Sequence, residues 1–286
     1  MPIISELGPL SRGQTQLLLK SLEKFPRKRL GQNFLIDKNI IFKSLQLAGP
    51  LSGENVIEIG PGLGSLTRAL LGAGCHVFAI ECDKILCEFL VNELGHLSRF
   101  YLVGGDAVER PLAGFEGRDE PFKIIANLPY NISTPWLSAV LERSELPVSM
   151  TLMLQREAAA RFLSQPGSKQ WSAISIFLHS AYVCEGIFPV SRASFWPVPA
   201  VDSVLIHLKR LEVPRIFHRE TRSLIRKIFT QRRKQIGSLI KLFLPQFFDE
   251  IGELLLKNDL DLSLRPEQIP SRFWHNFDNF LHTREL

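Results

Sequence analysis

Short apolar runs alternate with amphipathic stretches from about residue 55 to residue 210, and this alternation limits the fold more than any other feature. The runs have the length and composition of buried strands, and the stretches between them have helical spacing. Such a pattern predicts an α/β domain with a largely parallel, doubly wound sheet. The expected strands lie near Val56–Ile59, Val77–Ile80, Tyr101–Val103, Lys123–Ala126, Met150–Leu154, Tyr182–Ile187 and Ser203–Leu208.

The connection between the last two expected strands differs from the others. It contains the Pro-rich stretch Phe195–Pro199 and no helical stretch. A parallel crossover normally needs about a dozen residues or more and a helix. The last strand is therefore expected to pair antiparallel.

After Val213-Pro214 the apolar residues change to helical spacing. We expect two domains, with residues 1–213 forming an N-terminal segment and the sheet domain, and residues 214–286 forming a small all-helical domain. One apolar helical face is expected to contain Leu224, Ile225, Ile228, Phe229, Ile236, Leu239, Ile240 and Phe243.

Composition excludes several classes of protein. With 45% hydrophobic residues in 286, the chain can bury a large core, and it has no apolar run long enough to span a membrane. The first 25 residues do not resemble a signal peptide. Four cysteines lack paired metal-ligand spacing, so they are expected to be reduced, mostly buried thiols: Cys75, Cys82, Cys87 and Cys184. A cytoplasmic, metal-free protein is expected.

Positive charge is concentrated in two places. The net charge is +5, and the stretch from His218 to Leu242 holds eight Lys or Arg against the single acid Glu220. A second cluster comprises Lys24, Arg27, Lys28 and Arg29. Solvated helix faces are one explanation, but two clusters with few compensating acids favour binding to a phosphate backbone.

Polar groups are expected at the carboxyl ends of successive strands, where open α/β sheets bind ligands. The Gly-rich stretch Glu58–Gly64 follows the first strand and opens a helix, so backbone N–H groups can face a ligand. Glu81 ends the second strand, where it can accept hydrogen bonds from ribose hydroxyls, and Asp106 follows the third, where it can reach an adenine amino group.

Asn127-Leu-Pro-Tyr130 follows the fourth expected strand and suits a flat base that bears an amino group. The Asn127 side chain and the Leu128 carbonyl can accept hydrogen bonds, while Tyr130 supplies a stacking face. Phe195, in the Pro-rich loop, is a second candidate for stacking. An ordinary strand-to-helix loop is the alternative for the tetrapeptide alone.

A dinucleotide dehydrogenase would share the Gly-rich loop. In this chain, the third small residue of the dehydrogenase pattern Gly-X-Gly-X-X-Gly falls on Ser65 when the pattern is counted from Gly60. That alternative also leaves the Asn127–Tyr130 stretch and the basic stretch without a purpose.

Four ordered motifs together resemble the KsgA-type ribosomal RNA adenine N6,N6-dimethyltransferases. They are Arg27–Leu35, Glu58–Gly64, Asn127–Ser133 and Phe195–Ser203, and Phe229–Ile236 is similar to the segment that this family carries in its second domain. The resemblance implies a Rossmann-like methyltransferase that uses S-adenosylmethionine and releases S-adenosylhomocysteine. It implies dimethylation of two adjacent adenosines near the 3′ end of 16S rRNA in the small ribosomal subunit. Separately, the protein is expected to be a monomer without membrane association.

The resemblance also implies roles for individual residues. The residues that would bind the donor are Asn33, Leu35, Gly60, Glu81, Asp106 and Asn127. The residues that would bind and orient the target base are Asn127, Leu128, Tyr130 and Phe195. The helical domain would dock RNA phosphates through Arg222, Arg226, Arg232, Arg233 and Lys234. The departures are Leu30, where an aromatic residue is common, and Gly237, which interrupts the expected basic helix.

Two rival functions remain open at this point. An enzyme of the same fold that dimethylates large-subunit RNA and confers macrolide resistance shares the target-base motif, although the second domain argues against it. A non-catalytic assembly factor or transcription factor derived from the same family is the other rival. Intact Glu81, Asp106 and Asn127 favour catalysis over binding alone.

Overall fold

The computed structural model describes residues 7–27, 30–49 and 51–284. They form two compact units. The first unit runs up to Ala159 and includes Val183–Arg210, and the second comprises Ala160–Tyr182 and Leu211–Leu286. The domain boundary after residue 213 stays a prediction, and the assignment of Ala160–Tyr182 to the second unit had no counterpart in the sequence pattern.

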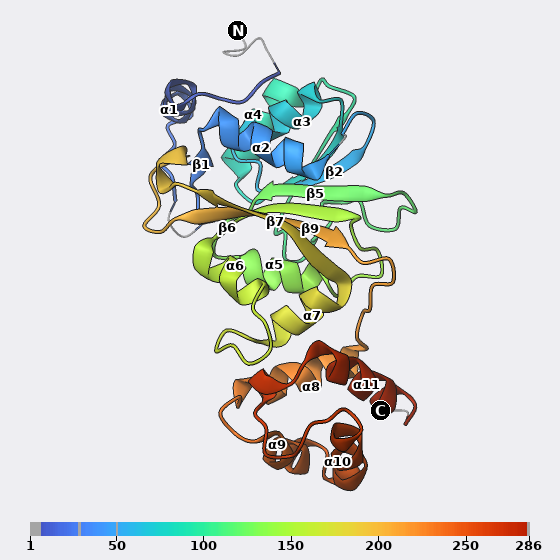
Figure 1. Cartoon of the computed structure of the whole chain (residues 1–286). Coiled ribbons are helices and arrows are strands. Elements are labelled where there is room, and N and C mark those ends of the chain that lie inside the picture. Colours follow the sequence, from blue (N-terminus) through green and yellow to red (C-terminus); the bar gives the residue numbers. More distant parts are fainter. Residues whose placement is uncertain (1–6, 28–29, 50, 285–286) are drawn as a thin grey trace. The chain divides into compact units, whose positions relative to one another are not determined.

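The first unit is built on a seven-stranded sheet with the order β4-β3-β2-β5-β6-β9-β7 (Figure 1). Its strands are β2 (Asn55–Ile59), β3 (His76–Glu81), β4 (Phe100–Gly104), β5 (Phe122–Asn127), β6 (Ser149–Gln155), β7 (Tyr182–Val190) and β9 (Ser203–Arg210). The pairs from β4 to β6 are parallel, and β9 runs antiparallel to β6 with Lys209 opposite Ser149. All seven expected strands are present, and the antiparallel last strand is confirmed.

The strand order reverses between β2 and β5. From β2 the chain continues outward to β3 and β4, and it then returns to place β5 on the other side of β2. At such a point the connections leave the carboxyl ends of neighbouring strands in opposite directions, which opens a crevice. This arrangement confirms the Rossmann-like α/β prediction and positions the ends of β2 and β5 side by side.

Helices cover both faces of this sheet. In Figure 1, α2, α3 and α4 lie on one face and α5 lies on the other. The helices of this part of the chain are α1 (Arg12–Ser21), α2 (Lys38–Ala48), α3 (Ser65–Gly72), α4 (Lys84–Leu94), α5 (Ser133–Val140) and α6 (Arg156–Phe162). Side-chain oxygens of Ser11, Asp37 and Asp83 accept backbone N–H groups at the starts of α1, α2 and α4. Val56, Val77 and Ile125 are fully buried between the layers.

A second, two-stranded sheet joins distant parts of the first unit. The strand β1 (Phe34–Leu35) pairs antiparallel with β8 (Phe195–Trp196), just after the 3₁₀ helix η2 (Arg192–Ser194). The backbone N–H of Ile36 continues the pairing by donating to the Ser194 carbonyl at 2.9 Å. The Ser194 hydroxyl also donates to the Asp37 carboxylate at 3.0 Å. Phe34 and Leu35 are thereby fixed against the start of the Pro-rich loop.

Every secondary-structure element assigned within the described residues 211–284 is a helix, which confirms the small helical C-terminal domain. Its helices are α8 (Arg219–Thr230), α9 (Ile236–Phe243), η3 (Pro245–Phe247), α10 (Phe248–Leu256), η4 (Pro266–Gln268) and α11 (Ser271–His282), and α7 (Ala173–Ala181) belongs to the same compact unit. Trp171, Phe273, Trp274 and Phe277 are at most 1% exposed and form the aromatic part of its core.

The expected basic helix is two helices. The chain leaves helical geometry between Thr230 and Ile236, so the break falls before Gly237 rather than at it. Gly237 lies inside α9, where its N–H donates to the Leu262 carbonyl at 2.9 Å. A Cβ atom at this position would lie 2.9 Å from the Leu262 Cβ, so the close approach of the two segments requires glycine.

Candidate active site

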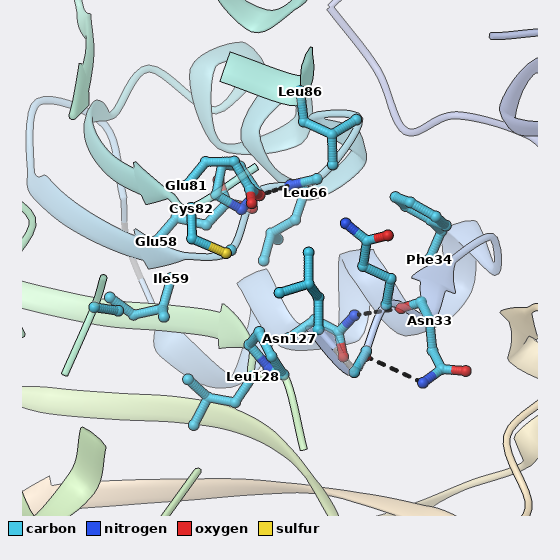
Figure 2. A pocket seen from close by; sticks show the side chains of 18 of the residues that line it. Asn33, Phe34, Glu58, Ile59, Leu66, Glu81, Cys82, Leu86, Asn127 and Leu128 are labelled. Atoms are coloured by element: carbon cyan, nitrogen blue, oxygen red, sulfur yellow. Dashed lines mark hydrogen bonds between the residues drawn. The ribbon is translucent and has the colours of Figure 1, made fainter. Parts of the chain in front are cut away.

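A cavity of about 250 Å³ lies at the carboxyl ends of β2, β3 and β5, where the strand order reverses. Its walls come from the Gly-rich loop after β2, the loops after β3, β4 and β5, and the segment before α2 (Figure 2). Eight of the predicted site residues line it: Asn33, Leu35, Gly60, Glu81, Asp106, Asn127, Leu128 and Tyr130. The structure therefore brings together the polar groups that the sequence places at successive strand ends.

The Gly-rich loop is held in a conformation that favours glycine. Gly60 and Gly62 have φ values of 66° and 62°. A Cβ atom on Gly60 would lie 3.1 Å from the Pro129 side chain, and one on Gly62 would lie 3.1 Å from the Phe34 ring. The loop therefore packs without side chains against both the segment after β5 and the segment before α2.

The Glu81 carboxylate ends β3 and is held by two backbone donors. Gly62 N–H donates to Oε2 and Asp83 N–H donates to Oε1, each at 3.0 Å. Burial raises the pKa of this carboxyl, while the two backbone hydrogen bonds oppose that change. Each carboxylate oxygen has a further lone pair, so the group can still accept hydroxyl donors from a ligand in the cavity.

Glu58 is a lining residue to which the sequence analysis gave no role of its own. It is 2% exposed, and burial raises the pKa of its carboxyl to about 8, with a smaller contribution from the nearby Glu81 charge. The Thr67 hydroxyl donates to Glu58 Oε2 at 2.7 Å and opposes this rise. The sequence feature that could have identified Glu58 as a site residue is its place at the end of β2, directly before the Gly-rich loop.

Asp106 lies in the loop after β4 and is exposed at the cavity. Its Oδ1 accepts the Val108 N–H at 2.8 Å, which fixes the carboxylate at the start of a turn. The backbone before it is tied to β3, because Gly105 N–H donates to the Glu81 carbonyl at 2.9 Å. The two acidic residues are thus positioned by one hydrogen-bonded connection.

The Asn127 side chain lies at the end of β5 and points toward the segment before α2 (Figure 2). Its Nδ2 donates to the Asn33 carbonyl at 3.2 Å, and the Asn33 side chain donates to the Gly31 carbonyl at 3.2 Å. Because its nitrogen is engaged in this way, Asn127 Oδ1 remains as the side-chain atom that can accept hydrogen bonds. Leu128 is buried and donates its N–H to the Met153 carbonyl at 3.3 Å.

The two aromatic candidates have different environments. Tyr130 is partly buried, lines the cavity and shares a hydrogen bond of 2.7 Å with the Ser203 hydroxyl. Phe195 is 1% exposed, packs in the core and is not among the lining residues. Its backbone pairs with Leu35, which does line the cavity. Stacking of Phe195 on the target base stays a prediction.

The basic candidates fall into two groups within the second unit. Arg232, Arg233 and Lys234 are exposed on the turn between α8 and α9, and Arg232 donates to the Lys169 carbonyl and approaches Glu267 at 3.9 Å. Arg222 and Arg226 lie on α8 and are half-buried, with the Arg226 guanidinium 5.4 Å from the Phe177 ring centroid. Of the cluster near residue 27, Lys28 and Arg29 lie outside the described residues. The expectation is wrong for Lys24, because its side chain is buried in an ion pair with Asp83 and is not available to a phosphate backbone.

The cysteines differ from the expectation of mostly buried thiols. All four are free, but Cys75 alone is buried, and Cys82 is exposed at the cavity. Partial burial raises the pKa of the Cys82 thiol to about 11, with Glu81 adding to the effect. Cys82 follows Glu81 directly, so the turn after β3 that carries the acid to the cavity also carries the thiol there.

No group of three or more His, Cys, Asp or Glu side chains within residues 7–27, 30–49 and 51–284 is arranged to hold a metal ion. Across the same residues, no helix has the length and apolar character needed to cross a membrane. Both findings concern the described part of the chain alone.

Comparisons with known proteins agree on one group. A family model described as Ribosomal RNA adenine dimethylase matches residues 24–266. A Ribosomal RNA small subunit methyltransferase A from Opitutus terrae is 48% identical over 269 residues, which cover 93% of this chain and 97% of that protein. A protein of the same name from Lactobacillus delbrueckii subsp. bulgaricus is 40% identical over 256 residues, or 85% of this chain and 86% of the relative.

Solved structures share the fold at lower identity. A dimethyladenosine transferase from Plasmodium falciparum has a TM-score of 0.73 at 22% identity, and the match covers 88% of this chain and 98% of that one. The 23S rRNA methyltransferase ErmE has a TM-score of 0.64 at 23% identity, over 87% of this chain and all of the other. At such identities the similarity shows a common fold.

Proposed function

Since this chain belongs to the ribosomal RNA adenine dimethylase family, it is an S-adenosylmethionine-dependent methyltransferase that dimethylates adenine in small-subunit rRNA, and we propose that its cavity holds donor and target base together. The finer proposal is that the substrates are two adjacent adenosines near the 3′ end of 16S rRNA. The observation that best supports one shared cavity for donor and target base is the position of Asn127, which reaches the same cavity as Glu81 from the neighbouring half of the sheet.

The lining of the cavity fits S-adenosylmethionine. Gly60 and Gly62 line the cavity, and Glu81 offers carboxylate oxygens to ribose hydroxyls. Asp106 is exposed at the cavity and can accept hydrogen bonds from an adenine amino group. When bound, the donor supplies an electrophilic methyl group on a sulfonium and is released as S-adenosylhomocysteine.

The protein's task is to orient the acceptor nitrogen. The exocyclic nitrogen of adenine is a weak nucleophile, because its lone pair is delocalised into the ring. Asn127 Oδ1 and the Leu128 carbonyl would accept hydrogen bonds from its amino hydrogens. These bonds would favour a pyramidal nitrogen and stabilise the positive charge that develops as the N–C bond forms. The nitrogen then loses a proton to solvent water, which restores its neutrality. No histidine lines the cavity formed by the described residues, and positioning rather than acid–base catalysis is proposed.

The target adenine must leave its stack to reach Asn127, at a cost of a few kcal/mol. Stacking on one aromatic ring returns about 1–3 kcal/mol, and Tyr130 presents such a ring at the cavity. We propose Tyr130 as the main stacking residue. A contribution from Phe195 would require its ring to leave the core in which it is 1% exposed.

We further propose that the basic residues of the second unit dock the phosphate backbone of an assembling small subunit, and that the enzyme acts in the cytoplasm as a monomer without a metal ion. Neutralising Arg233 and Lys234 together should weaken particle binding and lower the slope of log K against log salt by about two, without affecting donor binding. Neutralising Arg232 alone should lower the slope less than neutralising Arg233 and Lys234, because its guanidinium already contacts the Lys169 carbonyl. An unchanged slope would argue against this docking surface.

The function is tested by incubating the protein with radiolabelled S-adenosylmethionine and small-subunit particles from cells that lack the modification. Digestion of the RNA should yield labelled dimethyladenosine, and the Asn127→Ala variant should yield none. Protein-free large-subunit RNA, offered in parallel, should remain unlabelled. Tight particle binding without any label would instead identify an assembly factor that has lost its chemistry.

A further inference from the structure

Lys24 and Asp83 form an ion pair in the interior of the first unit. The side chains are each 2% exposed, although they lie 59 positions apart in the sequence. Lys24 follows α1, and its backbone N–H donates to the Leu19 carbonyl at 2.8 Å. Asp83 begins α4 by accepting the Ile85 N–H at 3.2 Å. The pair therefore joins the end of one helix to the start of another through two buried charges.

Asp83 is directly connected to the predicted ribose-binding carboxylate. Its backbone N–H donates to Glu81 Oε1 at 3.0 Å, while the Gly62 N–H holds the other oxygen. Burial by itself raises the pKa of the Asp83 carboxyl, but hydrogen bonds from Lys24 and Gln32 lower it overall, so the group is charged at neutral pH. The position of Asp83 thus sets the orientation of Glu81.

Lys24 is connected to the other wall of the cavity. The 24–35 segment, meaning Lys24–Arg27 and Leu30–Leu35, turns back so that Gln32 donates to Asp83 Oδ2 at 3.2 Å. Gln32 also accepts the Arg27 N–H at 2.9 Å. Asn33, the next residue, supplies the carbonyl that holds the Asn127 amide. Displacing Lys24 would release the segment that Asn127 depends on.

A buried pair is a costly way to stabilise a helix end, because both ions lose their hydration and the attraction must offset that loss. An apolar contact between α1 and α4 would serve folding as well. What the charged pair adds is geometry, since three donors converge on Asp83 and fix it relative to both walls of the cavity.

We propose that Lys24 and Asp83 are positioning residues for methyl-donor binding: their ion pair clamps the 24–35 segment against the cavity and orients Glu81. This inference rests on the proposed function, in which the cavity binds S-adenosylmethionine. The clamp acts through the hydrogen bonds of Gln32 and Asp83, and neither charged side chain needs to touch the donor.

The test compares Lys24→Met with Lys20→Met, which removes the same charge from the exposed end of α1. Isothermal titration with S-adenosylmethionine should show a dissociation constant about tenfold higher for Lys24→Met alone, the loss expected for one hydrogen bond to a charged group. In the donor-free protein, hydrogen exchange of the Gln32–Leu35 amides should be about tenfold faster, with the sheet unaffected.

Two further variants separate positioning from folding. Asp83→Asn keeps the helix cap but removes the charge, and the double variant with Lys24→Met should bind the donor no worse than either single variant, because the pair acts as a unit. Lys24→Arg, which keeps the charge, should recover most of the donor affinity. It also serves as the deciding variant if Lys24→Met does not fold.

The clamp is refuted if folded Lys24→Met binds the donor within twofold of Lys20→Met and exchanges its Gln32–Leu35 amides at the same rate. Uniformly faster exchange throughout the first unit would also refute it, since that result indicates general destabilisation. Failure of the wild-type protein to bind S-adenosylmethionine would instead refute the proposed function. The exchange comparison in the donor-free protein would then still decide whether the clamp exists.

Discussion

Replacing Glu58 with glutamine is expected to remove a large pH dependence from the stability of the first unit. Burial raises the pKa of the Glu58 carboxyl from 4.5 to about 8. Between about pH 5 and pH 7.5 the unfolded chain releases this proton while the folded protein keeps it. The folded state therefore loses stability as pH rises, by about 1.4 kcal/mol per unit at most and about 3 kcal/mol over this interval.

Glutamine is a suitable replacement because its side-chain oxygen can still accept the hydrogen bond that Thr67 donates to Glu58. Urea unfolding of both proteins at about pH 5 and pH 7.5 gives the difference in the free energy of unfolding at each pH, so that contributions of other titrating groups cancel. The advantage of Glu58→Gln should grow by about 3 kcal/mol toward the higher pH. A difference that stays constant within about 0.5 kcal/mol would show that Glu58 ionises normally in the folded protein.

Three other predictions concern the cavity. Gly60→Ala should lower the free energy of unfolding by about 1–3 kcal/mol and weaken donor binding, because the new Cβ meets Pro129 at a positive φ. Thermal unfolding measures the first effect and calorimetric titration the second. A variant with wild-type stability and donor affinity would contradict the requirement for glycine. Tyr130→Phe removes the hydrogen bond to Ser203, so it should lose about 1 kcal/mol of stability yet still form dimethyladenosine. Tyr130→Ala also removes the ring and should raise the KM for RNA. Equal KM values for the two variants would argue against stacking. Treating the enzyme with EDTA and then removing the chelator should leave its methylation of small-subunit particles unchanged. A loss of activity restored by one particular divalent cation would disprove a metal-free reaction.

Much of the fold could be predicted because strand composition and connection length are local signals. The antiparallel β9 followed from a connection that contains no crossover helix. By contrast, β1 and β8 have two residues each and no readable periodicity, so their pairing depends on the folded chain alone. The break between α8 and α9 was placed too late because Gly237 was the visible helix breaker, whereas its contact with Leu262 is tertiary.

The candidate site likewise has features that the local sequence predicts and features that depend on contacts between distant segments. Motif position placed Glu81, Asp106 and Asn127 at one edge of the sheet, because parallel strands deliver their carboxyl ends together. The burial of Phe195 could not be read from a Pro-rich loop, since the strand pairing that carries its ring into the core comes from a distant segment. Nor could the sequence show the ion pair of Lys24 and Asp83, because nothing local links a lysine and an aspartate 59 residues apart.

The pairing of β1 with β8 has a consequence for synthesis on the ribosome. Phe34 and Leu35 leave the exit tunnel early, but the backbone groups that hold them belong to Phe195 and Trp196. Contacts so distant in sequence form late, and domains emerge from the N-terminus at about 5–20 residues per second. A nascent chain arrested before residue 195 would have the Gly-rich loop and Glu81 outside the tunnel without a completed methyl-donor pocket. The newly made enzyme would thus acquire its affinity for the methyl donor only after Phe195 and Trp196 have left the tunnel.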